Sequence, residues 1–391
     1  MYNVQTLNRI SPRGIAQLPT DTYAVSTDHP HPDAILVRSY NMTDMKFSTS
    51  LKIIARAGTG VNNIPIERCT DGGIVVCNTP GANANSVKEL VIAGLFLASR
   101  RIIDGVTWVR TLAGLEGDVA QLVEKEKSKF AGPEIKGKTI GVIGLGTIGV
   151  MVANDALSLG MRVIGYDPFI SIESAWGLSR EIGRAQSMES LLEASDYLTL
   201  HVPLNKATVS MVNIARFKSM KRGIRILNFS RGDVVDKEDL RQALKLGIVA
   251  LYITDFPDRD ILGMPNTVAI PHLGASTPEA EDNCAAMAAA QIRAFLEQGT
   301  IINSVNFPDC EMSFSGNRRV CVSNLNIPGV VGQITNSMAK EGINIADMLN
   351  RSKGSVAYNI IDIDGDISDE NVQRIRSIKE VLQVRVLTCS Q

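Results

Sequence analysis

A glycine-rich turn near the middle of the chain constrains its fold more than any other feature. The turn places Gly144, Gly146 and Gly149 between a strand-like run at 138–143 and a helix-like run. In this spacing the first glycine permits a tight turn, the second lets the backbone approach a pyrophosphate, and the third lets the helix pack close to the strand. The N-terminus of the helix then faces the phosphates. The pattern predicts a parallel α/β sheet that carries a dinucleotide site.

An acidic residue after the next apolar run supports this interpretation. Asp167 follows residues 161–166 and is itself followed by Pro168 and Phe169 rather than by a basic residue. A carboxylate at the end of the second strand binds the ribose hydroxyls and repels a 2′-phosphate. A purely structural glycine turn is the alternative, but the turn and the acid together predict NAD and favour it over NADP.

Composition limits the classes of protein to which the chain can belong. At 391 residues it exceeds the usual size of one hydrophobic core, so we expect two or three domains. The formal net charge of −1 argues against a nucleic-acid or membrane-surface partner. No signal-peptide pattern, membrane-spanning run or CxxC pair is present, although the chain has six cysteines. We therefore expect a cytoplasmic protein with reduced thiols and no metal site.

Hydrophobic patterning predicts how the first two thirds of the chain are organised. Apolar runs at 34–37, 51–55 and 73–77 predict the first strands of an α/β sheet, and a helical pattern follows over 86–101. The charged stretch 116–133 predicts the end of a helix and an exposed loop. Beyond it, strands and helices alternate, which predicts a parallel sheet with helices on both faces.

The last third predicts a long helix and a small separate domain. An alanine-rich helix is expected over 278–298, because Thr277 and Pro278 precede it and Gly299 follows it. A turn-rich linker at 309–317 comes next. The tail then follows the order strand, helix, strand, strand, helix, strand, which is typical of a ferredoxin-like domain.

Two polar residues lie at predicted strand ends downstream of the glycine turn. Arg231 ends one apolar strand and His272 ends another. Ligands of open parallel sheets bind beyond the carboxyl ends of the strands. An arginine there can hold a substrate carboxylate bidentately, and a histidine can exchange a hydroxyl proton as hydride moves. Either residue alone is more often a solvated arginine or a loop histidine, but the combination predicts a dehydrogenase centre.

Five motifs resemble the D-isomer-specific 2-hydroxyacid dehydrogenases, and the resemblance covers nearly the whole chain. They are Arg-Ala-Gly-Thr-Gly-Val-Asn-Asn at 56–63, Asn-Thr-Pro at 78–80, Gly-Leu-Gly-Thr-Ile-Gly at 144–149, Ser-Arg-Gly at 230–232 and Pro-His-Leu-Gly-Ala-Ser-Thr at 271–277. The resemblance implies an α/β protein with two flavodoxin- or Rossmann-like parallel-sheet lobes. Residues 1–90 and 278–308 would form a discontinuous substrate-binding domain, and residues 91–277 the NAD-binding domain.

The same resemblance assigns roles to single residues. Arg231 would orient the substrate, and His272 would be the acid/base group. The residues expected to border NAD are Thr59, Gly144, Gly146, Thr147, Ile148, Gly149, Asp167, Val202, Phe229, Ser230, Arg231, Asp255, His272, Gly274 and Ala275.

One departure from the family pattern concerns the partner of the histidine. The family places a glutamate shortly after an Asp-x-Phe run, but residues 254–260 of this chain read Thr-Asp-Phe-Pro-Asp-Arg-Asp. One residue is missing beside Asp255, and no glutamate follows. Asp258 and Asp260 are the candidate replacements, although their side chains are shorter.

Three basic residues match positions that contact substrate in the resembled family. Arg38 closes a predicted strand and Arg56 opens a glycine loop, and both would face the acidic groups of a phosphorylated hydroxy acid. Lys127 lies where the family supplies a basic group from a neighbouring subunit. A solvated helix face is the alternative for Lys127.

The C-terminal part, 317–391, resembles an ACT domain, a small amino-acid-sensing module. The resemblance rests on Asn-Leu-Asn-Ile-Pro-Gly-Val-Val-Gly at 324–332 and Gly-Ile-Asn-Ile-Ala at 342–346. It implies L-serine as an effector bound by Asn324, Asn326 and Asn344, since an asparagine offers both a donor and an acceptor. The alternative is that these asparagines stabilise turns and the domain serves only assembly.

Taken together, these features favour NAD-dependent oxidation of 3-phosphoglycerate to 3-phosphohydroxypyruvate, the entry to serine synthesis, by a homo-oligomer. A dimer is expected from pairing of the cofactor domains, and a tetramer if the ACT domains also pair. The alternatives are a dehydrogenase of another 2-hydroxy acid, and a non-catalytic NAD- or amino-acid-sensing protein. The retained Arg231 and His272 argue against the latter.

Overall fold

The computed structural model describes residues 1–388, which form two compact units. One unit contains Met1–Asn83 and the described residues from Pro278 onward, and the other contains Ala84–Thr277. Within the described part of the chain, no helix is both long and apolar enough to cross a membrane. The chain therefore leaves its first unit once, builds the second, and returns at the start of a long helix.

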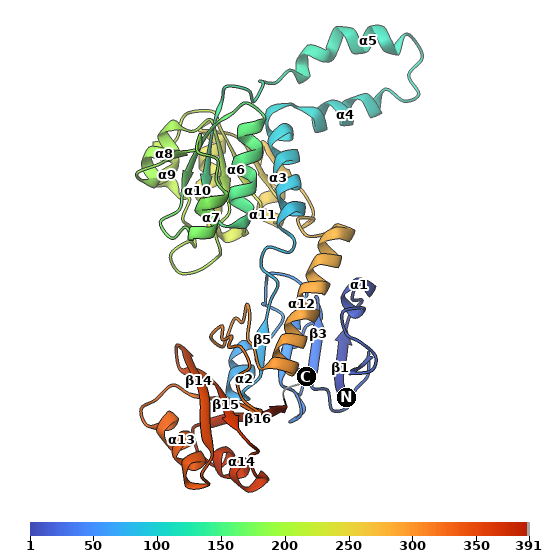
Figure 1. Ribbon diagram of the computed structural model, residues 1–391. Helices are drawn as coiled ribbons and strands as arrows, with labels where there is room; N and C mark the ends of the chain where they lie inside the picture. Colours follow the sequence, from blue (N-terminus) through green and yellow to red (C-terminus); the bar gives the residue numbers. More distant parts are fainter. Residues whose placement is uncertain (389–391) are drawn as a thin grey trace. The chain divides into compact units, whose positions relative to one another are not determined.

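The first unit is built on a five-stranded parallel sheet with the strand order β2-β1-β3-β4-β5 (Figure 1). This is the flavodoxin-like order. Sequence patterning predicted the last three of these strands and missed the first two. Its strands and short helices are β1 (Tyr2–Leu7), α1 (Pro12–Ile15), β2 (Tyr23–Ser26), β3 (Ala34–Val37), β4 (Ile53–Arg56), α2 (Ile66–Asp71) and β5 (Val75–Cys77).

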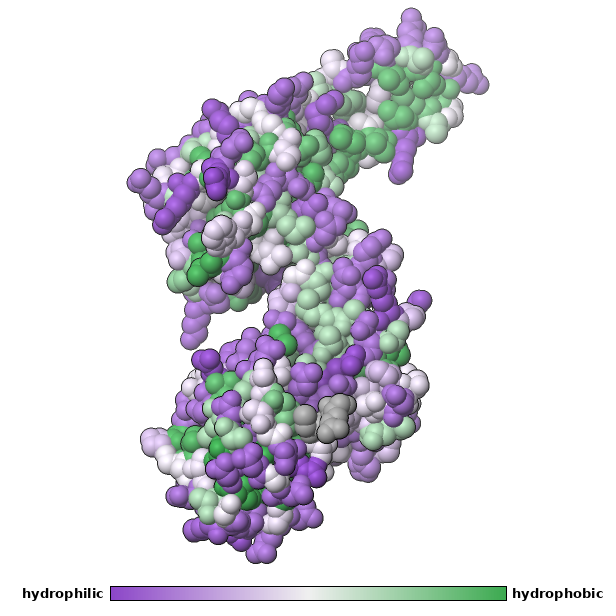
Figure 2. Space-filling view, viewed as in Figure 1, coloured by the Kyte–Doolittle hydropathy of each residue, from purple (hydrophilic) through white to green (hydrophobic). Residues whose placement is uncertain are grey.

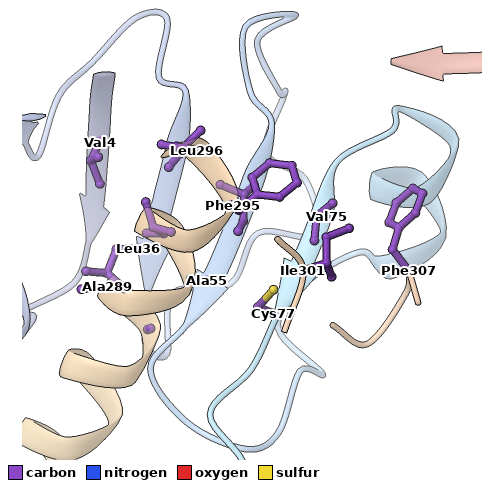
Figure 3. Packing of buried hydrophobic residues seen from close by; sticks show 14 of the residues in the cluster. Val4, Leu36, Ala55, Val75, Cys77, Ala289, Phe295, Leu296, Ile301 and Phe307 are labelled. Carbon is purple, nitrogen blue, oxygen red and sulfur yellow. The ribbon is translucent and has the colours of Figure 1, made fainter. Parts of the chain in front are cut away.

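The long helix α12 (Pro278–Gln298) covers one face of this sheet. Figure 3 shows Ala289, Phe295 and Leu296 of this helix packed toward strand residues that include Leu36 and Ala55. All five residues are at most 1% exposed. Because the two chain segments of the unit share this core, neither buries its apolar face without the other.

The second unit contains a seven-stranded sheet in the order β12-β11-β10-β9-β6-β7-β8. All neighbouring strands are parallel, and the order reverses beside β6, which is the Rossmann topology. Its strands are β6 (Thr139–Ile143), β7 (Arg162–Tyr166), β8 (Gly183–Arg184), β9 (Tyr197–Leu200), β10 (Ile224–Asn228), β11 (Val249–Thr254) and β12 (Thr267–Ala269). Its helices are α3 (Ala84–Ser99), α6 (Thr147–Ser158), α7 (Ile172–Gly177), α8 (Met188–Ala194), α9 (Ile214–Ser219), η2 (Gly232–Val234), α10 (Lys237–Lys245) and α11 (Arg259–Leu262).

A helical arm leaves the sheet of this second unit after α3 (Figure 1). It consists of α4 (Ile102–Thr111), α5 (Val119–Glu126) and η1 (Lys127–Phe130). Neither α4 nor α5 contains a buried residue. The exposed loop predicted over 116–133 is mostly helical in the structure. Asp118 stabilises the start of α5, because its side chain accepts a hydrogen bond from the backbone N–H of Gln121 at 3.0 Å.

The C-terminal part forms a four-stranded antiparallel sheet in the order β14-β15-β13-β16. With its two helices it follows the predicted βαββαβ order, so the predicted fold class is confirmed. Helices α13 and α14 cover one face of the sheet around a core of their own. Its elements are β13 (Arg318–Leu325), α13 (Val330–Lys340), β14 (Asn344–Lys353), β15 (Val356–Asp364), α14 (Asp369–Arg376) and β16 (Val381–Thr388).

The other face of this small sheet packs on the parallel-sheet lobe of the first unit. Cys321, Tyr358 and Leu387 belong to the same buried cluster as Phe295 of α12. Arg385 donates a hydrogen bond to the carbonyl of Phe295 at 3.0 Å and lies over its ring at 3.7 Å. Tyr358 donates to the carbonyl of Gly299 at 2.8 Å. Side chains of the sheet thus donate to carbonyls at and just beyond the C-terminal end of α12.

Arg319 forms the most buried ion pair of this interface. Its guanidinium binds Asp362 through Nε–Oδ1 and Nη2–Oδ2 contacts of 2.7 and 2.8 Å. The side chains are 1% and 0% exposed. Arg319 also donates to the carbonyls of Gln298 at 2.8 Å and Ser313 at 3.0 Å, so its donors are used on both sides of the interface.

Candidate active site and cofactor site

The glycine turn has the geometry that a pyrophosphate requires. Gly144 has a φ of +90°, a conformation that side chains rarely adopt. A Cβ atom at Gly146 would meet nothing within 4 Å, so the backbone there is open to a ligand. A Cβ atom at Gly149 would overlap the carbonyl of Gly144, which is why the helix approaches the strand so closely. Thr147 and Ile148 begin α6 beside this opening.

Asp167 lies beside the glycine turn and is held by two backbone N–H groups. Leu145 donates to Oδ2 and Phe169 donates to Oδ1, both at 2.8 Å. Val202 follows β9, on the side of β6 opposite to β7 and Asp167. Its Cγ1 would be 3.0 Å from a Cβ placed at Gly144. The open backbone, the helix N-terminus and the oriented carboxylate together fit NAD.

Arg231 is held by a loop that Asn228 shapes. Asn228 is fully buried at the end of β10, and its Nδ2 donates to the carbonyl of Arg231 at 2.9 Å. Its Oδ1 accepts from the Oγ of Ser230 at 2.9 Å. Phe229 packs so tightly on α3 that a Cβ at Gly94 would lie 2.8 Å from its ring. Asn228 belongs to the polar cluster that the sequence places around Arg231, but no role was predicted for it, although its position directly before Phe229 was the available signal.

Asp255 is the acidic residue that faces the predicted catalytic histidine. It follows β11 directly and is 1% exposed, and its Oδ2 would lie 3.4 Å from a Cβ at Gly274. Burial raises the pKa of Asp255, whereas the charges of His272 and Arg231 and the hydrogen bond from the N–H of Gly274 act against this rise. No residue of the described chain bonds its Oδ1. The structure thus brings Arg231, Asp255 and His272 together at the ends of adjacent strands.

The ring of His272 is exposed and lies 4.7 Å from the ring of Phe256, measured between centroids. Gly274 is buried and Ala275 is half-buried in the same loop. A second histidine at this edge of the sheet, His201, is poorly suited to proton exchange. Burial lowers the pKa of His201 to about 4, and its Nε2 is bonded to Thr199 Oγ1 at 2.9 Å.

The two aspartates considered as replacements for the family glutamate are engaged elsewhere. Asp258 caps α11 and binds Lys237 at 2.6 Å. Asp260 is 60% exposed and lies 3.6 Å from Arg241. Both partners belong to α10. The carboxylate that interacts electrostatically with His272 is that of Asp255.

Three residues of the first unit were predicted to contact substrate or cofactor, namely Arg38, Arg56 and Thr59. Arg38 directly follows β3, and Arg56 is the last residue of the adjacent strand β4. Arg56 Nε donates to the carbonyl of Arg38 at 3.1 Å. Thr59 is exposed, and its Oγ1 donates to Asn83 at 3.2 Å. Lys127 lies on the arm of the second unit.

The three predicted effector residues differ in exposure. Asn324 is 1% exposed, and its Oδ1 accepts from Asn359 Nδ2 at 2.7 Å, so its amide is used inside the sheet. Asn326 and Asn344 are exposed, and they donate to the carbonyl of Gly354 and to Asp364 at 3.1 and 2.7 Å. Of the three predicted effector residues, Asn326 and Asn344 thus reach the surface and Asn324 is buried.

Comparison with known proteins agrees with this geometry. The family described as D-isomer specific 2-hydroxyacid dehydrogenase, NAD binding domain, matches residues 92–274. D-3-phosphoglycerate dehydrogenases from Archaeoglobus fulgidus and Bacillus subtilis are 39% and 35% identical over 73% and 71% of this chain. The chain spans about half the length of these relatives, 53% and 52%.

Two solved structures extend the comparison to three dimensions. The NAD+-bound 3-phosphoglycerate dehydrogenase of Entamoeba histolytica is 27% identical, with a TM-score of 0.61 over 78% of this chain and 98% of that chain. The D-mandelate dehydrogenase of Rhodotorula graminis is 22% identical and shares the fold, with a TM-score of 0.67 over 80% of this chain and 99% of that chain. Residues 92–274 of this chain therefore belong to the NAD-binding domain of the D-isomer specific 2-hydroxyacid dehydrogenase family, and NAD is the cofactor of this domain.

Proposed function

We propose that this protein oxidises D-3-phosphoglycerate to 3-phosphohydroxypyruvate, the first step toward L-serine. The observation that carries the proposal is the convergence of Arg231, Asp255 and His272 at the carboxyl ends of the adjacent strands β10, β11 and β12. The similarity to D-3-phosphoglycerate dehydrogenases supports the choice of substrate. Within this proposal, residues 1–90 and 278–308 bind substrate, residues 91–277 bind NAD, and residues 317–391 are regulatory.

Each side chain has a chemical task in this reaction. When bound, NAD supplies the acceptor for the hydride that leaves the substrate carbon. Arg231 holds the substrate carboxylate in a bidentate contact, because a planar guanidinium matches a carboxylate. His272 accepts the hydroxyl proton as the carbonyl forms. Asp255 stabilises the imidazolium that results, because an adjacent negative charge favours the protonated ring.

Arg38 and Arg56 are proposed to bind the phosphate. Both lie at the carboxyl edge of the first parallel sheet, where ligands of such sheets bind. Two guanidinium groups complement a dianionic phosphate better than they complement the neutral hydroxymethyl group of glycerate. The preference for a phosphorylated hydroxy acid would therefore come from this pair.

The direct test is NADH formation by the purified full chain. With 3-phosphoglycerate we expect turnover at a kcat/KM at least tenfold higher than with D-glycerate, D-lactate or D-mandelate, because the unphosphorylated acids bring no phosphate for Arg38 and Arg56 to bind. A higher kcat/KM with one of the other acids would show that this acid, and not 3-phosphoglycerate, is the preferred substrate. No turnover with any of them would favour a non-catalytic NAD-sensing protein.

L-Serine is proposed as the effector, and the same assay tests it. Asn326 and Asn344 are exposed in the C-terminal domain and offer amide donors and acceptors for an amino acid. Added L-serine should lower the rate, whereas D-serine should not. A rate that is indifferent to L-serine would remove the regulatory role and leave the catalytic proposal intact. A cytoplasmic location belongs to the same proposal and is supported by five buried cysteines that are free in the described chain; Cys389 lies outside it.

We expect a homo-oligomer, and the helical arm supplies the surface. Its apolar residues are 40–54% exposed and gather over α4 and α5 (Figure 2). They are Ile102, Ile103, Val106, Val109, Leu115 and Val119. A patch of this kind marks an interface rather than a solvated face, and a second copy of the arm is its proposed occupant. Lys127, which pairs with Glu124 on this arm, would then be supplied to the neighbouring subunit's site.

A charge placed in this patch should separate the subunits. We expect Val106→Glu to sediment as a monomer at concentrations where the wild type is a dimer or tetramer, because burying a carboxylate costs more than one apolar contact contributes. Leu246→Glu is the matched control, since Leu246 is 56% exposed on the same unit but outside the arm. A dimeric Val106→Glu protein, or a monomeric Leu246→Glu protein, would contradict the assignment.

A further inference from the structure

An ion pair in the first unit occupies one of the two arginines assigned to the phosphate. Arg38 Nη1 lies 2.6 Å from Glu281 Oε1, and the side chains are 30% and 44% exposed. Arg38 follows β3, whereas Glu281 lies in the first turn of α12. The pair therefore joins the strand edge that presents Arg38 to the helix that returns the chain to this unit.

Arg56 and Cys284 complete the surroundings of this pair. Arg56 lies so close over Gly58 that a Cβ there would overlap its guanidinium, and its Nε bonds the backbone of Arg38. Cys284 is one turn further along α12 and is 4% exposed. Its thiol lies within electrostatic range of Arg38, Arg56 and Glu281. Two guanidinium groups and one carboxylate thus form a single charged cluster with a net charge of about +1.

The other acidic residues at the start of α12 do not share this arrangement. Asp282 accepts from Ser11 Oγ at 2.5 Å and lies 4.0 Å from Arg13. Glu279 is exposed and belongs to none of the ion pairs found among residues 1–388. Glu279 and Glu281 both lie in the first turn of α12, where an acid is favoured electrostatically, so helix stability does not explain why Glu281 rather than Glu279 contacts Arg38.

We propose that Glu281 is a counter-ion that the phosphate of the substrate must displace from Arg38, and that it thereby sets the affinity for phosphorylated hydroxy acids. This inference rests on the proposed function. A free phosphate dianion and the carboxylate of Glu281 compete for the same guanidinium and repel each other. An unphosphorylated acid such as D-glycerate brings no second anionic group to Arg38, so Glu281 affects its binding less. Glu281 is therefore a specificity residue.

The substitution Glu281→Gln removes this charge and keeps an oxygen that can accept from Arg38. We expect the KM for 3-phosphoglycerate to fall about three- to tenfold, an effect reduced by the partial exposure of the pair. The fall should exceed any change in kcat and should shrink as ionic strength rises, because salt screens exposed charges. The KM for D-glycerate should change less than about twofold. Glu279→Gln is the matched control and should leave the KM for 3-phosphoglycerate within about twofold of the wild-type value.

A binding measurement without catalysis separates this inference from the proposed function. The affinity of the full chain for inorganic phosphate, measured by isothermal titration calorimetry, should rise in Glu281→Gln and not in Glu279→Gln. If the wild type fails to oxidise 3-phosphoglycerate, the proposed function is wrong, and the phosphate titration still tests the pair. If the wild type oxidises it but Glu281→Gln shows an unchanged or higher KM and no tighter phosphate binding, the role of Glu281 is overturned.

Discussion

Replacing His272 with glutamine is expected to lower kcat for 3-phosphoglycerate oxidation by about a thousandfold, within the range that general acid–base groups contribute. Glutamine keeps the approximate size of the side chain but cannot accept the hydroxyl proton at neutral pH. His272 is exposed, so the fold should tolerate the change. Steady-state NADH formation gives kcat, and quenching of protein fluorescence by NADH shows that cofactor binding is retained.

The matched variants address the missing glutamate. Asp260→Asn should cost less than about threefold in kcat, because Asp260 is a largely exposed partner of Arg241. The loss of kcat in Asp255→Asn should lie between the losses in Asp260→Asn and His272→Gln. This substitution removes the buried carboxylate beside His272 and leaves the shape of the loop. Equal losses for Asp260→Asn and His272→Gln would show that Asp260 is the residue that supports the histidine, and Asp255 would lose that role.

The second large effect is expected on stability, at the ion pair between the C-terminal sheet and α12. We expect Arg319→Met to destabilise this sheet by about 3–5 kcal/mol, because it leaves the carboxylate of Asp362 buried without its cation. The variant also removes hydrogen bonds to Gln298 and Ser313. Hydrogen exchange of peptides from β13 and β15 measures the free energy of local opening, which suits a chain with several cooperative parts.

The neighbouring arginine is the control. Arg318 pairs with Asp366 at 2.6 Å, but these side chains are 33% and 80% exposed. Arg318→Met should therefore change the opening free energy by less than about 1 kcal/mol. The double variant Arg319→Met, Asp362→Leu should recover most of the loss, since replacing both partners leaves no buried charge. A similar cost for the two single variants would contradict the special role of the buried pair.

The pH dependence of this stability has a definite sign. Burial raises the pKa of Asp362, but hydrogen bonds from Arg319 and Ser315 and the charge of Arg319 outweigh this and lower it overall. An acid with a lowered pKa in the folded state stabilises the fold while it is ionised. The contribution is therefore complete above the unfolded pKa of about 3.9 and is lost as the pH falls through the lower folded value.

The sequence predicted the fold class because its signals are local. The glycine turn, the alternating strands and helices around it, and the βαββαβ tail each depend on residues close together in the chain. Strands β1 and β2 were missed because only Val4 is fully buried among the residues of β1, so its apolar pattern is weak. Helix α4 was missed for a related reason, since its apolar residues face solvent.

The same distinction applies to the site. Arg231 and His272 could be predicted because each follows a recognisable strand. The carboxylate beside His272 could not, because Asp255, Asp258 and Asp260 lie within six residues of one another and only their surroundings differ. Asp255 is buried and accepts a hydrogen bond from the N–H of Gly274. Asp258 instead pairs with Lys237, and Asp260 pairs with Arg241.

By itself, the sequence determined the parallel-sheet fold, the dinucleotide turn and the types of residue available for chemistry, because these depend on backbone conformation and hydrophobic period. Only the tertiary structure decided which charges meet. It paired Glu281 with Arg38 across 243 residues, and Arg319 with Asp362 and the end of α12. Such pairs depend on distances between elements, and those distances are set by the packing of the shared cores.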